Sequence, residues 1–195
     1  DETVSENTEK SEQELAYEKY QELLAENDDF IGWIKIEGTN VNYPVMQTID
    51  NPGFYLKHNF DGAYSDYGVP FLDERCAVDL TNNLVIYGHN MKNGTMFGKL
   101  DEYTNREFFD KNREIEIYMP GRILKYKIFA AYVFDNRHIM LSFDFEDKAE
   151  REIYLDTVFS KRSLYNFFAE DITVDTEDKI ITLSTCTKYD NKAER

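Results

Sequence analysis

The pattern of apolar and polar positions changes its period near residue 30. Before that point, apolar side chains recur at helical spacing between residues 11 and 27. The segment opens with SEQE, in which Ser11 and Glu14 have the spacing of a capping box. We therefore predict a helix over residues 11–27, which either packs on the domain or offers a surface to a partner. A flexible polar tail is expected over residues 1–10.

Beyond residue 30, short runs of β-forming residues alternate with turn residues. The predicted strands cover residues 30–36, 41–47, 67–73, 83–90, 114–120, 123–134 and 179–186. Pro44 lacks a backbone N–H, so it places the second run at a sheet edge or a bulge. The sequence MPGR predicts a hairpin turn over residues 119–122.

Two segments interrupt the strands with helical spacing. Residues 96–112 favour short helices, and residues 145–170 favour the longest helix of the chain. The apolar side of the longer helix is expected to hold Ala149, Ile153, Leu155, Val158 and Phe159. No repeat or linker divides the sequence, so residues 11–195 are expected to form one domain. Many short strands with few helices predict a mainly β barrel or sandwich.

Composition limits the class of protein. With 195 residues, of which 42% are hydrophobic, the chain is long enough to bury one core. The formal net charge of -16 argues against nucleic acid as a partner, because like charges repel. The sequence holds neither an apolar run long enough to span a bilayer nor a signal peptide. Because it opens with Asp1 rather than Met, the question of a membrane anchor outside this sequence stays open.

The sequence offers no pattern for a metal or a phosphate. Its three histidines, His58, His89 and His138, are isolated, and neither CxxC nor HExxH occurs. No GxGxxG or phosphate-binding loop is present either. We expect no metal site and no cofactor.

One thiol and one histidine stand at the ends of predicted strands. Cys186 follows KIITLST and precedes a polar loop, where a thiol can be half exposed. Taken alone, Cys186 is better interpreted as a small apolar side chain that closes a core. His89 follows the strand NLVIY and Gly88, a residue that allows an unusual backbone angle. A nucleophilic cysteine and its histidine partner are commonly adjacent only in the fold.

The segments NLVIYGHNMKNGTMFGKL and IITLSTC resemble sortases, the cysteine transpeptidases that attach proteins to Gram-positive cell walls. The resemblance extends from DDFIGWIKIEGTNVNYPVMQ through FYLKHNFDGAYSDYGVPFLD to the end of the chain. Within the family it is similar to class B, because one helix precedes the barrel and a long one precedes the cysteine strand. It implies a closed sortase-like β-barrel with these two helices and a single catalytic domain.

The resemblance also implies the catalytic residues. Cys186 matches the nucleophile, His89 the acid–base, and Arg195 the family's arginine, although the sequence ends at Arg195 before the strand that should hold it. Such an enzyme cleaves a sorting signal after Thr through a thioacyl-enzyme and transfers the protein to a peptidoglycan amine. It needs no metal or organic cofactor. Cys76 matches no family role.

Further residues correspond to the family's substrate groove. Asn42 and Met46 match a strand that lines the groove, and Ser184 and Thr185 directly precede the nucleophile. Ile139 is expected to form an apolar wall. Each of these residues also fits ordinary packing or solvation.

The resemblance implies partners and a location as well. The partners are the sorting-signal peptide of a surface protein and a peptidoglycan precursor amine. The location is the outer face of the cell membrane, with an N-terminal anchor outside this sequence. Two alternatives stay open: a cysteine peptidase that hydrolyses the same signal, and an inactive surface module that only binds.

Overall fold

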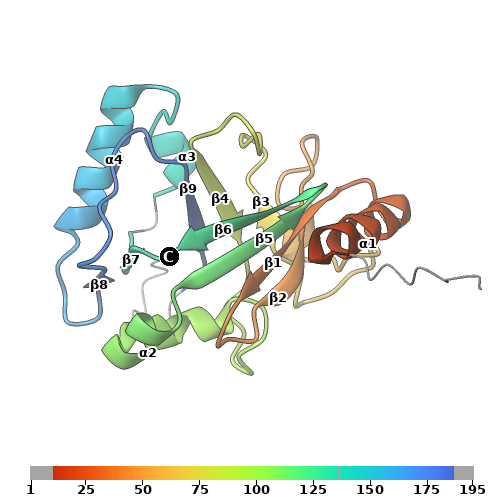
Figure 1. The fold of residues 1–195 in the computed structure, drawn as a ribbon, viewed down its shortest axis with the longest axis horizontal. Coiled ribbons are helices and arrows are strands. Elements are labelled where there is room, and N and C mark those ends of the chain that lie inside the picture. The colour runs from red at the N-terminus through yellow and green to blue at the C-terminus, as the bar shows by residue number, and fades with distance from the viewer. Residues whose placement is uncertain (1–10, 136, 187–195) are drawn as a thin grey trace, which may run out of the picture.

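The computed structural model describes residues 11–135 and 137–186 (Figure 1). The helices are α1 (Glu12–Glu26), η1 (Phe54–Leu56), η2 (Gly98–Thr104), α2 (Arg106–Lys111), α3 (Ile139–Ser142) and α4 (Lys148–Ser160), of which η1 and η2 are 3-10 helices. The strands are β1 (Phe30–Ile36), β2 (Asn42–Met46), β3 (Phe71–Leu72), β4 (Asn83–Tyr87), β5 (Glu114–Met119), β6 (Arg122–Lys127), β7 (Ala130–Ala131), β8 (Phe167–Phe168) and β9 (Ile180–Ser184). In this part of the chain the strands outnumber the helices, as the sequence predicts.

Seven of these strands form one sheet, in the order β6-β5-β1-β2-β3-β4-β9. The sheet curves into a nearly closed barrel, which confirms the expected barrel architecture (Figure 1). Its ladders are antiparallel except for β2–β3 and β4–β9, which are parallel. In Figure 1, α4 lies on one side of the barrel and α1 on the other.

The strand β4 is buried on both faces, which explains its uninterrupted apolar sequence. Leu84 and Ile86 belong to a core cluster shared with β1, β2, β3 and β5. Val85 points the opposite way and packs with Tyr154 and Val158 of α4. Burial of each such side chain contributes roughly 1.5–3 kcal/mol relative to its exposure. The end of β4 is therefore firmly anchored.

Helix α1 confirms the predicted N-terminal helix and its cap. The backbone N–H of Glu14 donates to Ser11 Oγ at 3.3 Å, and the backbone N–H of Ser11 donates to the Glu14 carboxylate at 2.8 Å. Tyr20 packs on Phe30 with 4.9 Å between the ring centroids. Leu15, another apolar residue of this helix, is 54% exposed. The contact between Tyr20 and Phe30 favours the interpretation that α1 packs on the domain.

The prediction of one helix over residues 145–170 is wrong at both ends. Asp147 caps α4 by accepting a hydrogen bond from the backbone N–H of Ala149. The helix ends before Asn166, whose side chain accepts from the N–H of Val133 and donates to the carbonyl of Lys161. Asn and Ser side chains satisfy backbone groups in this way and so compete with the helix. The chain then forms β8, which pairs with β7.

The buried side of α4 also differs from the prediction in part. Leu155 and Val158 are buried as expected, and Tyr154 joins them. Ala149 is exposed, and Ile153 is 50% exposed. Phe159, also on the predicted side, packs against the same cluster. The prediction therefore fails only at its two N-terminal positions.

One strand prediction needs a smaller correction. The run 123–134 is divided into β6 and β7: the β5–β6 pairing ends with the bond from the N–H of Ile128 to the carbonyl of Arg113, and Ala130 and Ala131 then pair with β8 instead. Pro44 pairs with Trp33 of β1, whereas β3 joins β2 only at Met46, so Pro44 has a strand neighbour on one side and lies locally at an edge, as predicted. The predicted turn over 119–122 is present.

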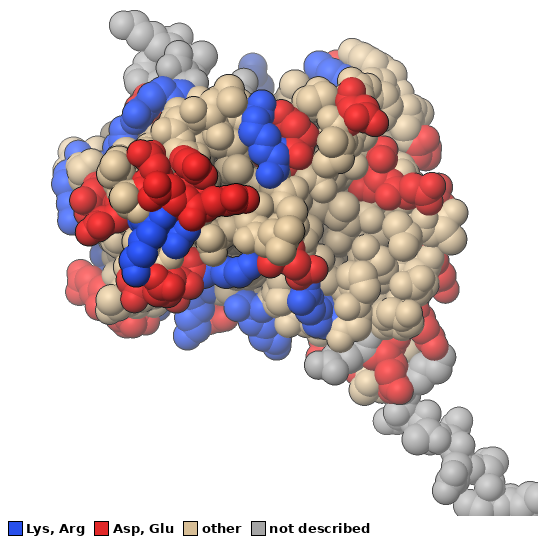
Figure 2. Space-filling model, turned by 90° about the horizontal axis from the view of Figure 1, so that it is seen from above, with Lys and Arg blue, Asp and Glu red and all other residues tan. Residues whose placement is uncertain are grey.

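Surface charges are mixed rather than separated. On the face that Figure 2 shows, Lys and Arg side chains lie among Asp and Glu side chains instead of forming a basic area of their own. The net charge of -16 is therefore not accompanied by a separate basic area on this face.

Asp135 ties the segment before α3 to the end of α4. Its carboxylate accepts from Arg137 Nε at 2.8 Å and lies 3.4 Å from Lys161 Nζ. The hydrogen bond from Arg137 lowers the pKa of Asp135 to about 2. Because the folded-state pKa lies below the usual value, the stabilisation is present above that value. It is lost as the pH falls through the folded-state pKa.

We therefore expect Asp135→Asn to lower the free energy of unfolding by at most about 1 kcal/mol at about pH 6, since the pair is partly solvated. The difference from wild type should shrink as the pH falls from about 4 to about 2. Urea unfolding at several pH values measures it. A difference that stays constant over this range would contradict the assignment.

Candidate active site

The parallel pairing of β4 and β9 brings the two sequence motifs together. Tyr87 is opposite Ser184 at the last step of the ladder, so both strands end at the same edge of the sheet (Figure 1). His89 follows β4 by two residues, and Cys186 follows β9 by two residues. Residues separated by almost a hundred positions in the sequence therefore leave the sheet side by side.

Three hydrogen bonds join the two segments beyond the ladder. The N–H of Gly88 donates to the carbonyl of Ser184 at 3.1 Å. The hydroxyl of Thr185 donates to the carbonyl of Gly88 at 2.7 Å. The side-chain amide of Asn90 donates to the carbonyl of Cys186 at 2.6 Å. The thiol of Cys186 is free and exposed, so it meets solvent rather than closing a core.

His89 is held by the backbone on two sides. The N–H of Phe97 donates to the His89 carbonyl at 2.9 Å. The ring Nε2 lies 2.7 Å from the carbonyl oxygen of Leu56, the last residue of η1. A carbonyl oxygen only accepts, so Nε2 carries the hydrogen in this bond. The neutral ring is then left with Nδ1 as its proton acceptor.

Gly68 controls the position of the carbonyl that His89 contacts. Its φ is +57°, in the left-handed region that favours glycine. A Cβ at this position would lie 2.4 Å from the oxygen of Tyr55 and 2.7 Å from the oxygen of Leu56. Only glycine lets this backbone approach η1 so closely.

We expect Gly68→Ala to destabilise the protein by about 1–3 kcal/mol through backbone strain. It should also lower kcat, because the displaced Leu56 carbonyl no longer orients His89. Thermal unfolding and steady-state kinetics measure the two effects. Gly62→Ala is the matched control, since Gly62 also has a positive φ but a Cβ there meets nothing within 4 Å. Equal losses of kcat in both variants would contradict this role for Gly68.

Gly88 does not use the backbone freedom that glycine allows. It is absent from the residues with positive φ in the described part of the chain, so no unusual backbone angle is needed. A Cβ there would lie 2.6 Å from the ring of Phe97, which is fully buried. Glycine at this position therefore makes room for the ring of Phe97.

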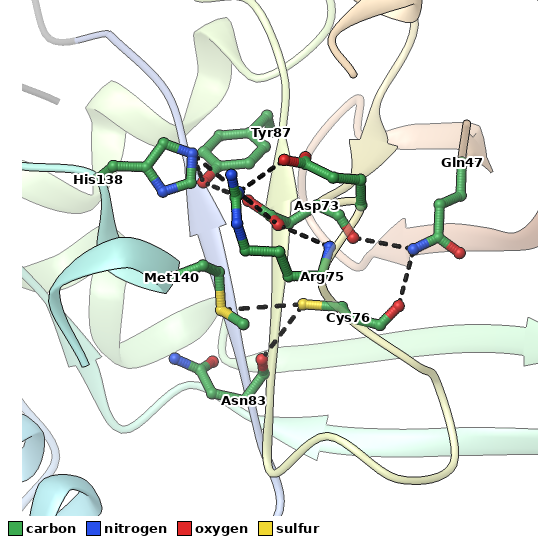
Figure 3. A network of polar contacts seen from close by, with 9 residues as sticks. Gln47, Asp73, Arg75, Cys76, Asn83, Tyr87, His138 and Met140 are labelled. Carbon is green, nitrogen blue, oxygen red and sulfur yellow. Dashed lines mark hydrogen bonds and ion pairs between the residues drawn. The ribbon is translucent and has the colours of Figure 1, made fainter. Parts of the chain in front are cut away.

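A polar network centred on Asp73 contacts Tyr87 at the end of β4 (Figure 3). The carboxylate of Asp73 is fully buried and accepts from the hydroxyl of Tyr87 at 3.1 Å. Arg75 Nη1 lies 3.2 Å from this carboxylate, and His138 Nε2 lies 3.5 Å from it. Arg75 offsets the cost of burying the charge. Because His138 directly precedes α3, the network ties α3 to the strand that carries the histidine motif.

A cleft of ≈ 380 Å³ borders the cysteine strand. Its walls come from β6, β7 and β9 and are largely apolar, with Ile181 and Leu183 among them. Ser184, Thr185 and Ile139, three of the predicted substrate contacts, also line it. The cleft therefore reaches Thr185, the residue that precedes Cys186.

The chain is similar to proteins of one known family. A family model for the sortase domain matches residues 34–195. Sortase B of Staphylococcus aureus (strain NCTC 8325 / PS 47) is 33% identical over 175 residues, which are 89% of this chain and 70% of that protein. The solved structure of Clostridium perfringens sortase B is 34% identical with a TM-score of 0.80, over 89% of this chain and 94% of that one. A Staphylococcus aureus sortase B–substrate complex is 30% identical with a TM-score of 0.78, over 91% of this chain and 81% of that one.

The chain belongs to the sortase family, class B. The family resemblance drawn from its two motifs is thereby confirmed. Sortases are cysteine transpeptidases, so this protein is an enzyme that catalyses acyl transfer. The family also places its function in cell-wall anchoring of surface proteins.

The second cysteine of this sortase lies in a different environment. Cys76 is buried, and its thiol donates to the carbonyl of Asn83 at 3.6 Å and contacts Met140. Burial raises the pKa of the Cys76 thiol to about 11. A neutral thiol without access to solvent is a poor nucleophile.

The remaining predicted residues lie away from the cleft or outside the described residues. Asn42 is exposed and accepts from the indole N–H of Trp33 at 2.6 Å, and it does not line the cleft. Met46 is fully buried among the side chains that pack under α1, so the structure does not support it as a substrate contact. Arg195 lies outside the residues that the structure describes.

Some contributors to the site carry no clear signal in the sequence. The carbonyl of Leu56 is a backbone group, which every residue has. Asn90 stands in the quoted YGHN motif, but its bond to Cys186 depends on the pairing of distant strands. Asp101, which accepts from Asn90, looks like an ordinary charged residue of a short helix.

Within the described ranges, no group of three or more His, Cys, Asp or Glu side chains could hold a metal ion. Among the same residues, no helix has the length and apolar character needed to cross a membrane.

Proposed function

We propose that this class B sortase cleaves a C-terminal sorting signal after Thr and joins the protein to an amine of a peptidoglycan precursor. The observation that carries the proposal is the junction of β4 and β9, where His89 and an exposed Cys186 leave the sheet together. Solved relatives support the two substrates: one sortase B structure is a substrate complex and another is complexed with triglycine, a short peptide that has a free amine.

The first half of the reaction forms a thioester. The Cys186 thiolate attacks the carbonyl carbon of the signal's Thr, and the bond to the next residue breaks. The His89 ring is cationic at this stage, because its Nδ1 has taken the proton of the Cys186 thiol, and it gives this Nδ1 proton to the departing amine. Through Nε2–H, the Leu56 carbonyl keeps the imidazole in the orientation this transfer needs and stabilises its charged form.

The second half reverses these roles. The acceptor amine attacks the thioester carbonyl, His89 takes a proton from that amine, and Cys186 leaves as the thiolate. Water in place of the amine would give hydrolysis, which is the activity of a cysteine peptidase. The outcome depends on which nucleophile reaches the thioester first.

Other residues have supporting roles in the proposal. Arg195 would place positive charge at the developing oxyanion or at a substrate carbonyl; removal of such a donor typically costs about 10²–10³ in rate. Ser184, Thr185 and Ile139 would hold the signal peptide along the cleft. The proposed location is the outer face of the cell membrane, with an N-terminal anchor outside this sequence.

The test is a partition experiment. The protein is incubated with a small library of sorting-type peptides, with and without triglycine, and the products are separated by liquid chromatography and mass spectrometry. An amide product with triglycine supports the transpeptidase. A free acid in the presence of saturating triglycine favours the peptidase, and peptide binding without any cleavage favours the inactive module.

A further inference from the structure

The backbone that carries Cys186 lies beyond the last pair of the sheet. The β4–β9 ladder ends at Ser184, and Cys186 itself is exposed. A nucleophile in such a place needs another constraint, because a small misplacement can cost about 10²-fold in rate. The side chain of Asn90 supplies a contact at this point.

Asn90 bridges the nucleophile's backbone to a buried acid. Its Nδ2 donates to the carbonyl oxygen of Cys186 at 2.6 Å and to Asp101 Oδ2 at 2.9 Å. Both partners are oxygens, and the amide nitrogen carries two hydrogens, so each bond has its own donor. The arrangement makes full use of the donors of one side chain.

Asp101 anchors Asn90 at a rigid part of the structure. Its side chain belongs to η2 and is only 8% exposed. The helix η2 begins next to Phe97, which is fully buried, and the hydroxyl of Thr104 donates to the Asp101 carbonyl at 2.6 Å. A charge-assisted hydrogen bond to a buried carboxylate holds its donor more firmly than a bond to a neutral acceptor does.

We propose that Asn90 is a positioning residue, which fixes the backbone of Cys186 by linking its carbonyl to Asp101. A peptide unit is planar, so fixing its carbonyl also fixes the adjoining bond and narrows the directions open to the thiol. The variant Asn90→Asp cannot do this, because its carboxylate would face the carboxylate of Asp101 and the carbonyl of Cys186. The inference rests on the proposed role of Cys186 as nucleophile.

The test compares four variants in a Cys76→Ala background, so that Cys186 is the single thiol. Asn90→Ala should lower kcat roughly 10- to 100-fold and change KM less than about threefold. Asn93→Ala is the matched control in the same loop: its side chain bonds to Thr95 instead, and kcat should stay unchanged. An Asn90→Ala enzyme with the background's kcat would overturn the proposal.

The exchange variant separates positioning from packing. The double variant Asn90→Asp, Asp101→Asn restores a hydrogen bond between positions 90 and 101 but leaves the Cys186 carbonyl without its donor. Its thermal unfolding temperature should recover relative to Asn90→Asp alone, whereas kcat should stay low. Recovery of kcat in the exchange variant would show that only the 90–101 contact matters, and would overturn the proposal.

A second readout is independent of any peptide. Alkylation of Cys186 by iodoacetamide should be about threefold slower or more in Asn90→Ala, because the thiol and His89 lose their alignment. If no variant and no parent enzyme transfers a peptide, the proposed function fails while this comparison still tests Asn90. Equal alkylation rates in Asn90→Ala and its parent would count against the positioning role itself.

Discussion

Cys186→Ala is expected to abolish acyl transfer while the fold persists. The thiol is exposed, and the ladder that pairs β9 with β4 ends before it, so its removal leaves no cavity. Without a nucleophile no thioester forms, and kcat should fall by at least about 10³-fold. Circular dichroism and thermal unfolding check the fold, and product formation from a cleaved sorting peptide checks the activity.

Cys76→Ala is the matched control for this experiment. Cys76 is buried in the barrel core and contacts Met140, so its truncation should cost about 1–2 kcal/mol of stability. The kcat should stay close to wild type, because this thiol never meets the substrate. A folded Cys76→Ala protein without activity, or an active Cys186→Ala protein, would contradict the assignment of the nucleophile.

His89→Ala should lower kcat by about 10²–10⁴-fold, the usual contribution of a general acid–base. The variant lacks a group that can protonate the leaving amine, although the thiol of Cys186 remains. KM should change little, because the ring's bond to Leu56 is made with the protein rather than with the peptide. Steady-state kinetics with a fluorogenic sorting peptide separate the two parameters.

His58→Ala is the control for His89→Ala. The ring of His58 lies 2.7 Å from the carbonyl of Phe54, in the same 3-10 helix that His89 contacts, and it stacks on the Phe54 ring. Removal of the His58 ring should therefore disturb η1 and lower the stability of the protein, while His89 remains as the general acid–base residue. If both histidine variants lose kcat to the same extent, the effect comes from η1 and not from proton transfer.

The sequence predicts the fold well where local pattern and tertiary structure agree. The alternation in β1 and β5, the continuous apolar run of β4 and the capping box of α1 each produce the expected element. The pattern fails at residues 161–170, where apolar side chains continue but Asn166 binds backbone groups that a helix would need. β7 and β8 have only two residues each, so no periodicity reveals them.

The candidate site was predictable in its chemistry and not in its supports. The motifs around His89 and Cys186 pointed to a thiol and a histidine at strand ends, and the parallel pairing of β4 and β9 places them together. Their supports come from elsewhere: the Leu56 carbonyl, and Asn90 through its bond to Asp101. Such contacts depend on three-dimensional packing, which a pattern along one chain does not encode.

The most direct test of the central claim is to trap the thioacyl-enzyme. The protein is mixed with a cleaved sorting peptide in the absence of an amine acceptor, quenched in acid and digested, and the modified peptide is identified by mass spectrometry. The account predicts an adduct on Cys186 whose mass equals the signal up to its Thr, and which is released as an amide when triglycine is added before the quench. An adduct on Cys76, or product formation by folded Cys186→Ala protein, would contradict it.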